Sequence, residues 1–286
     1  MPTFKWFQSK TLMLGINQIY EQNCQDGFKL LDDESIDLII TSPPYADMKR
    51  YENFEGIHPD KYVEWFLPKV QSMPRVLKDT GSFILNINDK VDVNGFRHPY
   101  VFNLISEITK NTEFKLYERL FWNKGKYIPN SKRFGDKIEY LFWFVKSNNF
   151  KFNIDQMRVP YDPKSIKRMS YKLKKRHSRT AENQDAKDYK DWHPNPGGAL
   201  PSTLVTIGSE SRRVSNHHVA VYPEKLAEYF IKGSTDEGDL VLDPFMGSGT
   251  TAVVSNRLKR NWIGFEISKL YIDESIQRIN NNLIIQ

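Results

Sequence analysis

The stretch that decides the fold is VLDPFMGSGTT, residues 241–251, where an apolar run leads into a glycine-rich turn. The apolar residues predict a buried strand, and the residues after the turn have a helical pattern. Gly247 and Gly249 permit a tight turn with close backbone approach to a ligand, and the first N–H groups of the helix point at that ligand. A strand, a glycine-rich turn and a helix in this order are typical of a nucleotide-binding α/β sheet.

Two known glycine-rich motifs differ in how well they match this turn. A Walker loop requires a lysine after its last glycine, and Thr250 stands there, which argues against NTP hydrolysis. The looser dinucleotide pattern fits residues 247–252, and Glu266 follows Gly247 by 19 residues, at the end of the next predicted strand. An acid there suits hydrogen bonds to ribose hydroxyls. These residues leave three interpretations open: a site for NAD, a site for S-adenosylmethionine, and a turn that binds no ligand.

The rest of the chain alternates helix and strand patterns, which predicts an α/β sheet. Residues 58–81 have the pattern of a helix that is interrupted at Pro68 and Pro74 and closed by Gly81. The other predicted helices are 25–31, 99–112, 222–234 and 250–260, and the predicted strands are 17–23, 35–42, 82–88, 114–124, 138–146, 239–243 and 261–268.

The stretch TSPPY, residues 41–45, ends the buried strand of residues 35–42 in an unusual way. Neither Pro43 nor Pro44 carries an N–H group, so the turn offers carbonyl acceptors with few competing donors. A loop whose prolines only end the strand is one interpretation. A cradle for an amino group, which donates two hydrogen bonds, is the other.

The positive charge of the chain is concentrated in one segment. Of 286 residues, 41 are Lys or Arg and 35 are Asp or Glu, a net charge of +6. Residues 151–213 hold 14 of the basic and 7 of the acidic residues, so the remainder is close to neutral. The segment lacks a sustained apolar period, which predicts an inserted recognition module instead of core. A basic run is often only a solvated surface, but a local excess in a neutral chain favours a surface for a phosphate backbone.

Composition also limits the class of protein. A single cysteine, Cys24, excludes an intramolecular disulfide framework and a cysteine-rich zinc site. No apolar run reaches the length of a membrane span, and the first ten residues lack the apolar core of a signal peptide. His177, His193, His217 and His218 match no common zinc spacing. We therefore expect a cytoplasmic protein that has no metal site and makes no contact with a membrane.

Taken together, these residues resemble the amino-directed DNA methyltransferases, which methylate exocyclic amino groups of adenine or cytosine. The family's catalytic motif D/N/S-P-P-Y/F is matched by residues 42–45, and its cofactor motif D-P-F-x-G-S-G-T-T by residues 243–251. The order of the motifs is similar to that of the family's β group, with the catalytic half first, the target-recognition region next and the cofactor half last. The resemblance covers nearly all of residues 12–280 except the basic segment.

The resemblance implies the Rossmann-like fold of the S-adenosylmethionine-dependent methyltransferases, circularly permuted, with a mixed sheet and helices on both faces. The cofactor strand then lies beside the catalytic strand, although it comes late in the chain. We expect residues 1–150 to form the catalytic half of the methyltransferase domain and residues 151–215 a target-recognition insert. Residues 216–286 are then the cofactor-binding half of the same domain.

The resemblance also gives TSPPY a chemical role, with Ser42, Pro43, Pro44 and Tyr45 as the catalytic residues. The Ser42 hydroxyl and the Pro43 carbonyl accept both amino N–H groups of the target base, which aims the nitrogen lone pair at the methyl donor. Tyr45 stacks on the face of the base. The base has to leave the duplex, because its amino group is otherwise paired.

S-adenosylmethionine is the implied cofactor. Asn23 is expected to face its adenine, although Asp is common at this position in the family, and Glu266 to accept hydrogen bonds from the ribose hydroxyls. Asp243 either contacts the cofactor or fixes the loop. The remaining predicted cofactor residues are Thr41, His218, Ala220, Tyr222, Phe245, Gly247, Ser248, Gly249 and Thr250.

Double-stranded DNA is the implied partner. The serine form of the catalytic motif usually goes with cytosine N4, so we expect a site-specific cytosine-N4 DNA methyltransferase, the modification enzyme of a restriction-modification system. Adenine N6 stays open, because the hydrogen-bonding argument fits either amino group. The resemblance is compatible with a homodimer and with a paired restriction endonuclease. The predicted DNA contacts are Lys172, Lys174, Lys175, Arg176 and Arg179 to phosphates, and Arg212 and Arg213 to phosphates or guanine edges.

Two functions of other classes compete with this expectation. An NAD-dependent oxidoreductase uses the glycine-rich turn but leaves TSPPY and the basic segment unexplained. A DNA-binding module without catalysis explains the basic segment, and it would be indifferent to the replacement of Ser42 by alanine.

Overall fold

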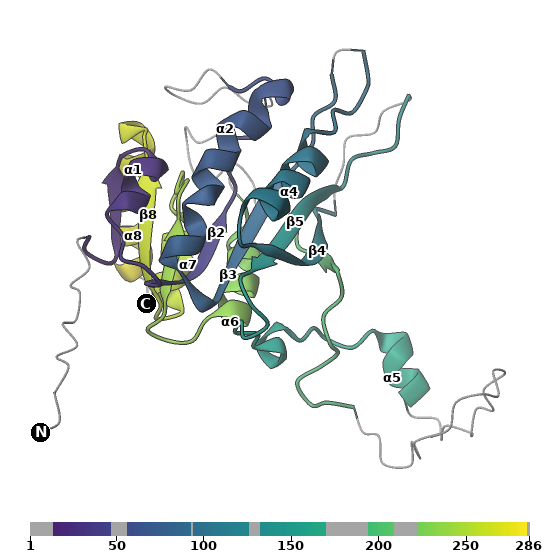
Figure 1. The fold of residues 1–286 in the computed structure, drawn as a ribbon. Coiled ribbons are helices and arrows are strands. Elements are labelled where there is room, and N and C mark those ends of the chain that lie inside the picture. Colours follow the sequence, from purple (N-terminus) through teal and green to yellow (C-terminus); the bar gives the residue numbers. More distant parts are fainter. Residues whose placement is uncertain are drawn as a thin grey trace, which may run out of the picture.

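An eight-stranded sheet forms the centre of the molecule (Figure 1). The strands are β1 (Gln18–Glu21), β2 (Ile36–Thr41), β3 (Leu77–Ile87), β4 (Lys115–Asn123), β5 (Ile138–Val145), β6 (Leu204–Thr206), β7 (Leu240–Asp243) and β8 (Asn261–Glu266). Their order across the sheet is β1-β8-β7-β2-β3-β5-β4-β6, and β5 is the one described strand that is antiparallel to both its neighbours. The structure is a computed structural model that describes residues 14–46, 56–92, 94–125, 132–169, 194–208 and 222–284.

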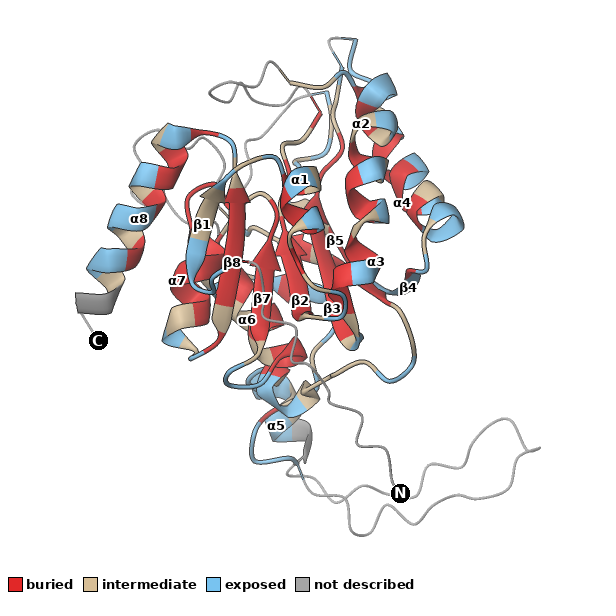
Figure 2. Cartoon of the chain, turned by 60° about the vertical axis from the view of Figure 1, so that its left-hand side comes forward, coloured by how far each residue is buried: buried red, intermediate tan, exposed pale blue. Residues whose placement is uncertain are grey.

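Helices cover both faces of the sheet, as the resemblance implies (Figure 2). One buried cluster joins α1, α2 and α4 to the face that carries Ile39 and Phe83, and a second joins α6, α7 and α8 to the face that carries Leu38 and Ile84. Neighbouring residues of a strand point to opposite faces, so both faces of these strands are apolar. None of the described helices is long and apolar enough to span a membrane. The helices are α1 (Cys24–Lys29), α2 (Pro59–Gln71), α3 (Met73–Val76), α4 (Tyr100–Asn111), η1 (Ile154–Met157), α5 (Pro163–Met169), α6 (Glu224–Ser234), α7 (Thr250–Arg257) and α8 (Lys269–Ile284).

The pairing of β2 with β7 joins two strands that are about two hundred residues apart in the chain. At the amino end of β2, the buried Asp37 carboxylate accepts the Leu240 N–H at 3.0 Å and pairs with the Lys78 ammonium at 2.8 Å. At the carboxyl end, the Thr41 hydroxyl donates to Asp243 at 2.8 Å. The cofactor strand therefore lies beside the catalytic strand, as expected. TSPPY and the glycine-rich turn meet at one edge of the sheet, which we call the carboxyl edge.

The helix predicted over residues 58–81 is partly wrong. α2 continues through Pro68, because Phe66 and Val70 hold the helix in the core although Pro68 has no N–H to donate. The chain turns through the short α3 and is already in β3 from Leu77. Gly81 does not end a helix but lies inside β3, where a Cβ would come within 2.9 Å of the Asp37 carbonyl oxygen. The remaining predicted elements are present with small shifts of their ends.

The described residues on either side of the basic run leave the sheet at its amino edge, away from TSPPY. Because β5 is antiparallel, its last residue Val145 lies at that edge. From there the Lys151 N–H donates to the Thr80 carbonyl at 2.8 Å, and α5 lies beyond (Figure 1). β6 then brings the chain back to the carboxyl edge, where Thr206 pairs with Asn123.

The stretch from residue 209 to residue 221 is bounded at the carboxyl edge on both sides. Before it, the Ile207 carbonyl accepts the Trp122 indole N–H at 2.7 Å, next to the end of β4. After it, the Tyr222 hydroxyl bonds to Asp243 and Thr251 at the end of β7. Of the basic residues predicted from sequence, Arg212 and Arg213 belong to this stretch, which is outside the described residues.

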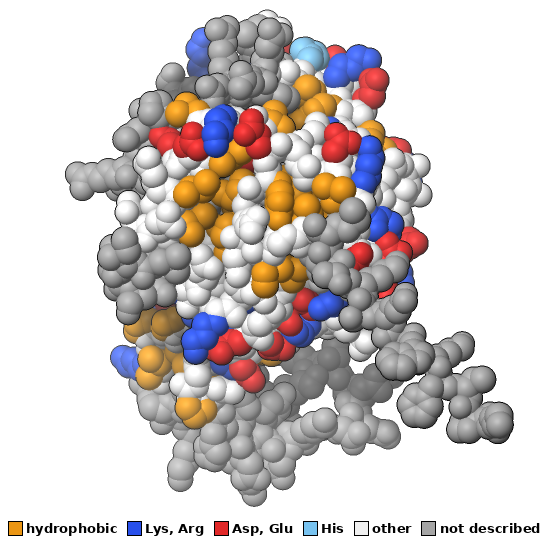
Figure 3. All heavy atoms as spheres, turned by 90° about the vertical axis from the view of Figure 1, so that its left-hand side faces the viewer, with side chains coloured by type: hydrophobic (Ala, Val, Ile, Leu, Met, Phe, Trp, Pro, Cys, Tyr) orange, Lys and Arg blue, Asp and Glu red, His pale blue; other side chains and the backbone are white. Residues whose placement is uncertain are grey.

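Charge on the described surface is mixed. In the face of the molecule shown in Figure 3, hydrophobic side chains form a band, with acidic and basic side chains together along its margins. The basic excess of the sequence is therefore not found among the described residues of this face.

The packing of α1 on β8 gives a stability prediction. A Cβ on Gly27 would lie 2.5 Å from the ring of the fully buried Phe265, so Gly27→Ala forces the helix or the ring to shift. We expect urea unfolding to show a loss of about 1–3 kcal/mol in the free energy of unfolding. Gly208→Ala is the control, since no atom lies within 4 Å of a Cβ there. Equal stability of the two variants would contradict this account of the contact.

Candidate active site

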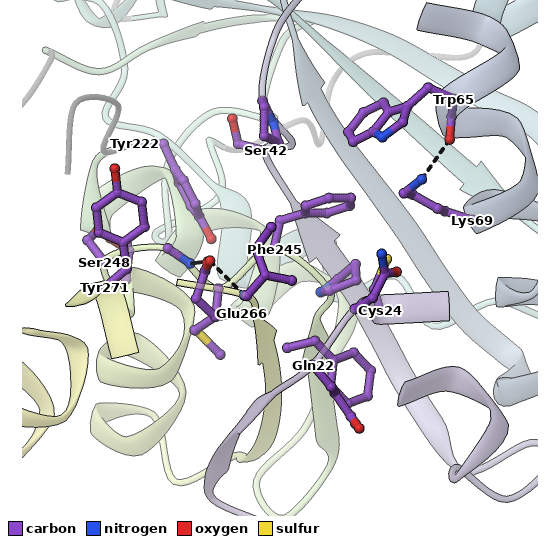
Figure 4. Close-up of a pocket in the computed structure, with 18 residues that line it drawn as sticks. Gln22, Cys24, Ser42, Trp65, Lys69, Tyr222, Phe245, Ser248, Glu266 and Tyr271 are labelled. Carbon is purple, nitrogen blue, oxygen red and sulfur yellow. Dashed lines mark hydrogen bonds between the residues drawn. The ribbon is translucent and has the colours of Figure 1, made fainter. Parts of the chain in front are cut away.

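A pocket opens at the carboxyl edge, where β2, β7 and β8 end (Figure 4). It is lined by residues from both motifs and from three distant parts of the chain. Ser42 and Pro44 come from TSPPY, and Trp65 and Lys69 come from α2. The other lining residues are Gln22, Asn23, Cys24, Tyr222, Pro244, Phe245, Met246, Gly247, Ser248, Thr250, Phe265, Glu266, Ile267 and Tyr271.

The glycine-rich turn has the backbone conformation that its glycines predict. Gly247 and Gly249 have φ values of 52° and 76°, in the left-handed region that favours glycine. Gly249 directly precedes α7, and a Cβ on it would lie 3.1 Å from Ser275. The turn therefore brings its backbone against the pocket with the start of α7 behind it.

Glu266 holds this turn from the neighbouring strand. Its carboxylate accepts backbone N–H groups from Gly247 at 2.9 Å, Ile267 at 2.9 Å and Ser268 at 3.0 Å. Burial raises the pKa of Glu266. A carboxylate offers about four acceptor directions, so these three bonds leave room for one more donor from the pocket.

Asp243 lies beneath the pocket and is fully buried. One of its oxygens accepts the Thr41 hydroxyl at 2.8 Å and the Phe245 N–H at 3.1 Å, and the other accepts the Thr251 hydroxyl at 2.6 Å and the Tyr222 hydroxyl at 3.5 Å. Of the two interpretations of Asp243, this arrangement supports the one in which it fixes the loop. The same contacts place Thr41 beneath the pocket instead of in its lining.

TSPPY reaches the pocket with Ser42 and Pro44, and Pro43 is not among the lining residues. The Ser42 hydroxyl lines it, and no described residue donates a hydrogen bond to the Pro43 carbonyl. The Pro44 carbonyl is occupied, because the Tyr62 hydroxyl donates to it at 2.8 Å. Tyr45 does not line the pocket. Its ring packs against the core, and its hydroxyl lies beside the Ser42 hydroxyl at 3.2 Å.

A protein-family model described as DNA methylase matches residues 36–277. The chain belongs to this family. The type II methyltransferase M1.MboII of Moraxella bovis is 31% identical over 276 residues, covering 92% of this chain and 96% of the relative. The type II methyltransferase M.PvuII of Proteus hauseri is 29% identical, covering 91% and 83% of the two chains.

Solved structures confirm the methyltransferase fold of this DNA methylase. The structure described as PvuII DNA methyltransferase (cytosine-N4-specific) aligns with a TM-score of 0.68 at 24% identity, covering 93% of this chain and 90% of that one. A structure described as an M1.HpyAVI–SAM complex aligns with a TM-score of 0.58 at 22% identity, covering 92% and 98%. The circular permutation and the recognition insert stay predictions.

Of the predicted site residues that the structure describes, Thr41 and Asp243 lie beneath the pocket, and Pro43, Tyr45 and Gly249 do not line it. Those that line it are Asn23, Ser42, Pro44, Tyr222, Phe245, Gly247, Ser248, Thr250 and Glu266. Asn23 lines the pocket, and its side-chain oxygen caps α1 by accepting the Gln25 N–H at 3.0 Å. Several predicted residues lie outside the described part of the chain, so their positions are not tested. These are His218, Ala220, Lys172, Lys174, Lys175, Arg176, Arg179, Arg212 and Arg213. His177, His193 and His217, which were not expected to bind metal, also lie outside the described residues.

Sequence reasoning missed several lining residues. The Gln22 side-chain nitrogen is buried without a hydrogen-bond partner among the described residues, so its donor is available to an acceptor in the pocket. Lys69 is buried, lies 4.3 Å from the centre of the Trp65 ring and has a pKa lowered by burial. Burial raises the pKa of the Cys24 thiol to about 12, so it stays protonated at neutral pH. None of these residues belongs to a motif, although Gln22 directly precedes Asn23.

Asp243 generates a pH prediction. Burial raises its pKa from the ordinary value of 3.8 to about 6. Between these values the folded chain binds the proton more tightly than the unfolded chain, so the stability from this group falls as pH rises from 4 to 6. Asp243→Asn removes this dependence. Urea unfolding across this range should show the variant gaining up to about 3 kcal/mol relative to the wild type as pH rises. Parallel stability curves would contradict the burial of an ionisable Asp243.

Proposed function

We propose that this DNA methylase transfers a methyl group from S-adenosylmethionine to the N4 amino group of cytosine in duplex DNA. DNA methyltransferase activity follows from membership of the family. The observation that carries the finer proposal is the pocket that Ser42, the glycine-rich turn and Glu266 line together. The serine of TSPPY and the description of a fold neighbour as cytosine-N4-specific both support cytosine over adenine.

The residues of the pocket fit the cofactor. When bound, S-adenosylmethionine supplies an electrophilic methyl group on a sulfonium that leaves as a neutral thioether. Glu266 has an acceptor direction left for a ribose hydroxyl, and the buried Gln22 nitrogen has a donor for a ring nitrogen of the adenine. Phe245 and Trp65 present apolar rings, 6.0 Å apart between centroids, on the same side of the pocket. Two fold neighbours are described as holding this cofactor, M1.HpyAVI and the Thermus thermophilus protein TTHA0409.

The chain's own contribution to the reaction is to hold the amino group. The Ser42 hydroxyl and the Pro43 carbonyl accept its two N–H groups, which fixes the nitrogen and directs its lone pair toward the pocket. Because the prolines bring no competing N–H donors, both acceptors stay available to the base. The target cytosine leaves the duplex to reach them. Adenine N6 is the second candidate, since the same two acceptors suit its amino group.

Further parts of the proposal concern partners and organisation. We assign residues 1–150 and 216–286 to one methyltransferase domain, and residues 151–215 to target recognition. Relatives described as type II methyltransferases support a partnership with a restriction endonuclease. A homodimer and a cytoplasmic location belong to the same proposal. Family membership removes the NAD-dependent oxidoreductase from consideration.

Ser42→Ala tests the proposed chemistry. The variant loses one of two acceptors for the amino group, so single-turnover methyl transfer from labelled S-adenosylmethionine to unmethylated DNA should fall by about a hundredfold or more. Binding of S-adenosylhomocysteine should persist, because Ser42 makes no hydrogen bond to the glycine-rich turn. Ser35→Ala is the matched control at the other end of β2, where the hydroxyl bonds to the Asp32 carbonyl at 2.8 Å.

The product of the wild-type reaction decides the base. Digestion of the methylated DNA to nucleosides, followed by mass spectrometry, should yield N4-methyldeoxycytidine. N6-methyldeoxyadenosine as the product would contradict the proposal that the base is cytosine. A Ser42→Ala variant with full activity would contradict the proposed catalytic role of TSPPY.

The salt dependence of DNA binding tests the proposed DNA surface. We expect the double variant Arg212→Ala, Arg213→Ala to bind DNA more weakly. The slope of the logarithm of the binding constant against the logarithm of the salt concentration should become shallower by about 1–2, because fewer phosphate contacts mean that fewer counterions are released on binding. The pair Lys174→Ala with Lys175→Ala should change the slope in the same direction. Fluorescence anisotropy at several salt concentrations measures both.

The control for this experiment removes two exposed lysines at the amino edge, with Lys110→Ala and Lys259→Ala. Lys110 lies at the end of α4 and Lys259 just before β8, both outside the proposed recognition segment of residues 151–215. This double variant should leave the slope unchanged. A slope that stays at the wild-type value in both basic pairs would count against the proposed DNA surface.

A further inference from the structure

A line of polar groups leads from the pocket to a carboxylate that neither motif contains. The Ser42 hydroxyl oxygen lies 3.2 Å from the Tyr45 hydroxyl oxygen, which lies 2.7 Å from Oε2 of Glu139. Glu139 is the second residue of β5, and because β5 is antiparallel, its first residues lie at the carboxyl edge. The Glu139 side chain is 14% exposed. The three groups therefore connect the substrate side of Ser42 with a largely buried acid.

The chemistry of these groups fixes the direction of their hydrogen bonds. A carboxylate only accepts, and a bond to a charged acceptor is stronger than one to an amide, so the single Tyr45 proton goes to Glu139 in preference to the Asn86 oxygen at 3.2 Å. The Tyr45 oxygen then accepts the proton of Ser42. This leaves the lone pairs of the Ser42 oxygen for the pocket, which is the state that an incoming amino group requires.

Two neighbours hold the carboxylate in place. The Lys124 ammonium lies 3.2 Å from Oε1, and the Asn86 side-chain nitrogen lies 3.3 Å from Oε2. The same nitrogen also donates to the Tyr140 carbonyl at 3.2 Å. Glu139 is therefore oriented toward Tyr45 by Asn86 of β3 and by Lys124, which directly follows β4.

The reaction that we propose for this chain needs a proton acceptor. Once the amino nitrogen has formed its bond to the methyl carbon, it carries a positive charge and has to lose a proton. TSPPY supplies a neutral hydroxyl and a neutral carbonyl, neither of which is a base at neutral pH. The nearest carboxylate that a hydrogen-bonded path from Ser42 reaches among the described residues is Glu139.

We propose that Ser42, Tyr45 and Glu139 form a proton relay for methyl transfer, an inference that rests on the proposed function. The nitrogen lone pair forms the bond to the methyl carbon, and the electron pair of the broken carbon–sulfur bond leaves with the sulfur. The charged nitrogen passes a proton to the Ser42 oxygen, Ser42 passes its own proton to the Tyr45 oxygen, and Tyr45 passes its proton to Oε2 of Glu139. One proton moves from base to carboxylate, and both hydroxyl groups are restored.

The relay is specific to the tyrosine form of the motif. The family motif permits phenylalanine at this position, which keeps an aromatic ring but has no hydroxyl to connect Ser42 with Glu139. Tyr45→Phe therefore removes the relay and leaves the ring, and Glu139→Gln removes the acceptor and leaves the shape. Tyr140→Phe is the matched control, because its hydroxyl lies on the next residue of β5 and points to Asp89 at 3.4 Å.

Single-turnover methylation of unmethylated DNA is the first test. We expect Tyr45→Phe and Glu139→Gln to slow methyl transfer by about a hundredfold, within the range of general acid–base catalysis, and Tyr140→Phe to keep the wild-type rate. The wild-type rate should fall in D₂O, because the relay moves exchangeable protons. The Tyr45→Phe rate should not fall, because this variant lacks the relay. Affinity for S-adenosylhomocysteine should stay at its wild-type value in all three variants.

A binding measurement tests the direction of the hydrogen bonds without any turnover. With S-adenosylhomocysteine present, the wild type should bind a duplex carrying cytosine at the modified position more tightly than one carrying 2-pyrimidinone, which lacks the amino group. Tyr45→Phe and Glu139→Gln should lose this preference, since Ser42 is no longer committed to donating away from the pocket.

The outcomes separate the relay from the function on which it rests. If the wild type methylates DNA and Tyr45→Phe does so at the same rate, the relay is overturned and the proposed function is not. A loss of rate that is matched by an equal loss of S-adenosylhomocysteine affinity also overturns it, because Tyr45 then acts through the shape of the site. A wild-type chain that methylates no DNA overturns the proposed function and the relay together.

Discussion

The parallel pairing of β2 with β7 is the constraint on which the rest of the molecule depends. The two strands are held at both ends by buried carboxylates, with Asp37 accepting from Leu240 at one end and Asp243 accepting from Thr41 at the other. Strands that lie far apart in sequence need such specific contacts, because closing a long loop costs entropy that local interactions do not offset. With this pairing in place, TSPPY and the glycine-rich turn end at the same edge and share one pocket.

Three carboxylates around this pocket have different roles, and the groups that donate hydrogen bonds to each one determine its role. Asp243 receives hydroxyl and backbone donors from both motifs and holds the floor of the pocket. Glu266 receives three backbone N–H groups and faces the pocket with its remaining acceptor capacity. Glu139 receives a tyrosine hydroxyl and a lysine ammonium and lies behind the serine. Burying a carboxylate without such donors costs roughly several kcal/mol of folding free energy, so each of these three positions depends on its donors.

Much of the fold could be predicted from the sequence, because the strands near Ile39, Phe83 and Phe265 are apolar on both faces. The two motifs gave most of the site, since each is a continuous stretch whose chemistry is visible in its residue types. Gln22 and Glu139 could not be found in this way. Gln22 is significant because burial leaves its side-chain nitrogen without a partner among the described residues. Glu139 is significant because β5 places it next to Tyr45. Both conditions arise only when the chain folds. The end of α3 was missed because Gly81 has the pattern of a helix end, whereas the chain already pairs with β2 from Leu77.

A crystal structure of the chain bound to S-adenosylhomocysteine and a duplex that contains its modified site would show directly how TSPPY holds the target base. We expect a cytosine outside the double helix, with its amino nitrogen within hydrogen-bonding reach, about 2.7–3.2 Å, of the Ser42 hydroxyl and the Pro43 carbonyl. A cytosine that stays paired in the duplex, or an amino group out of reach of both acceptors, would contradict this expectation.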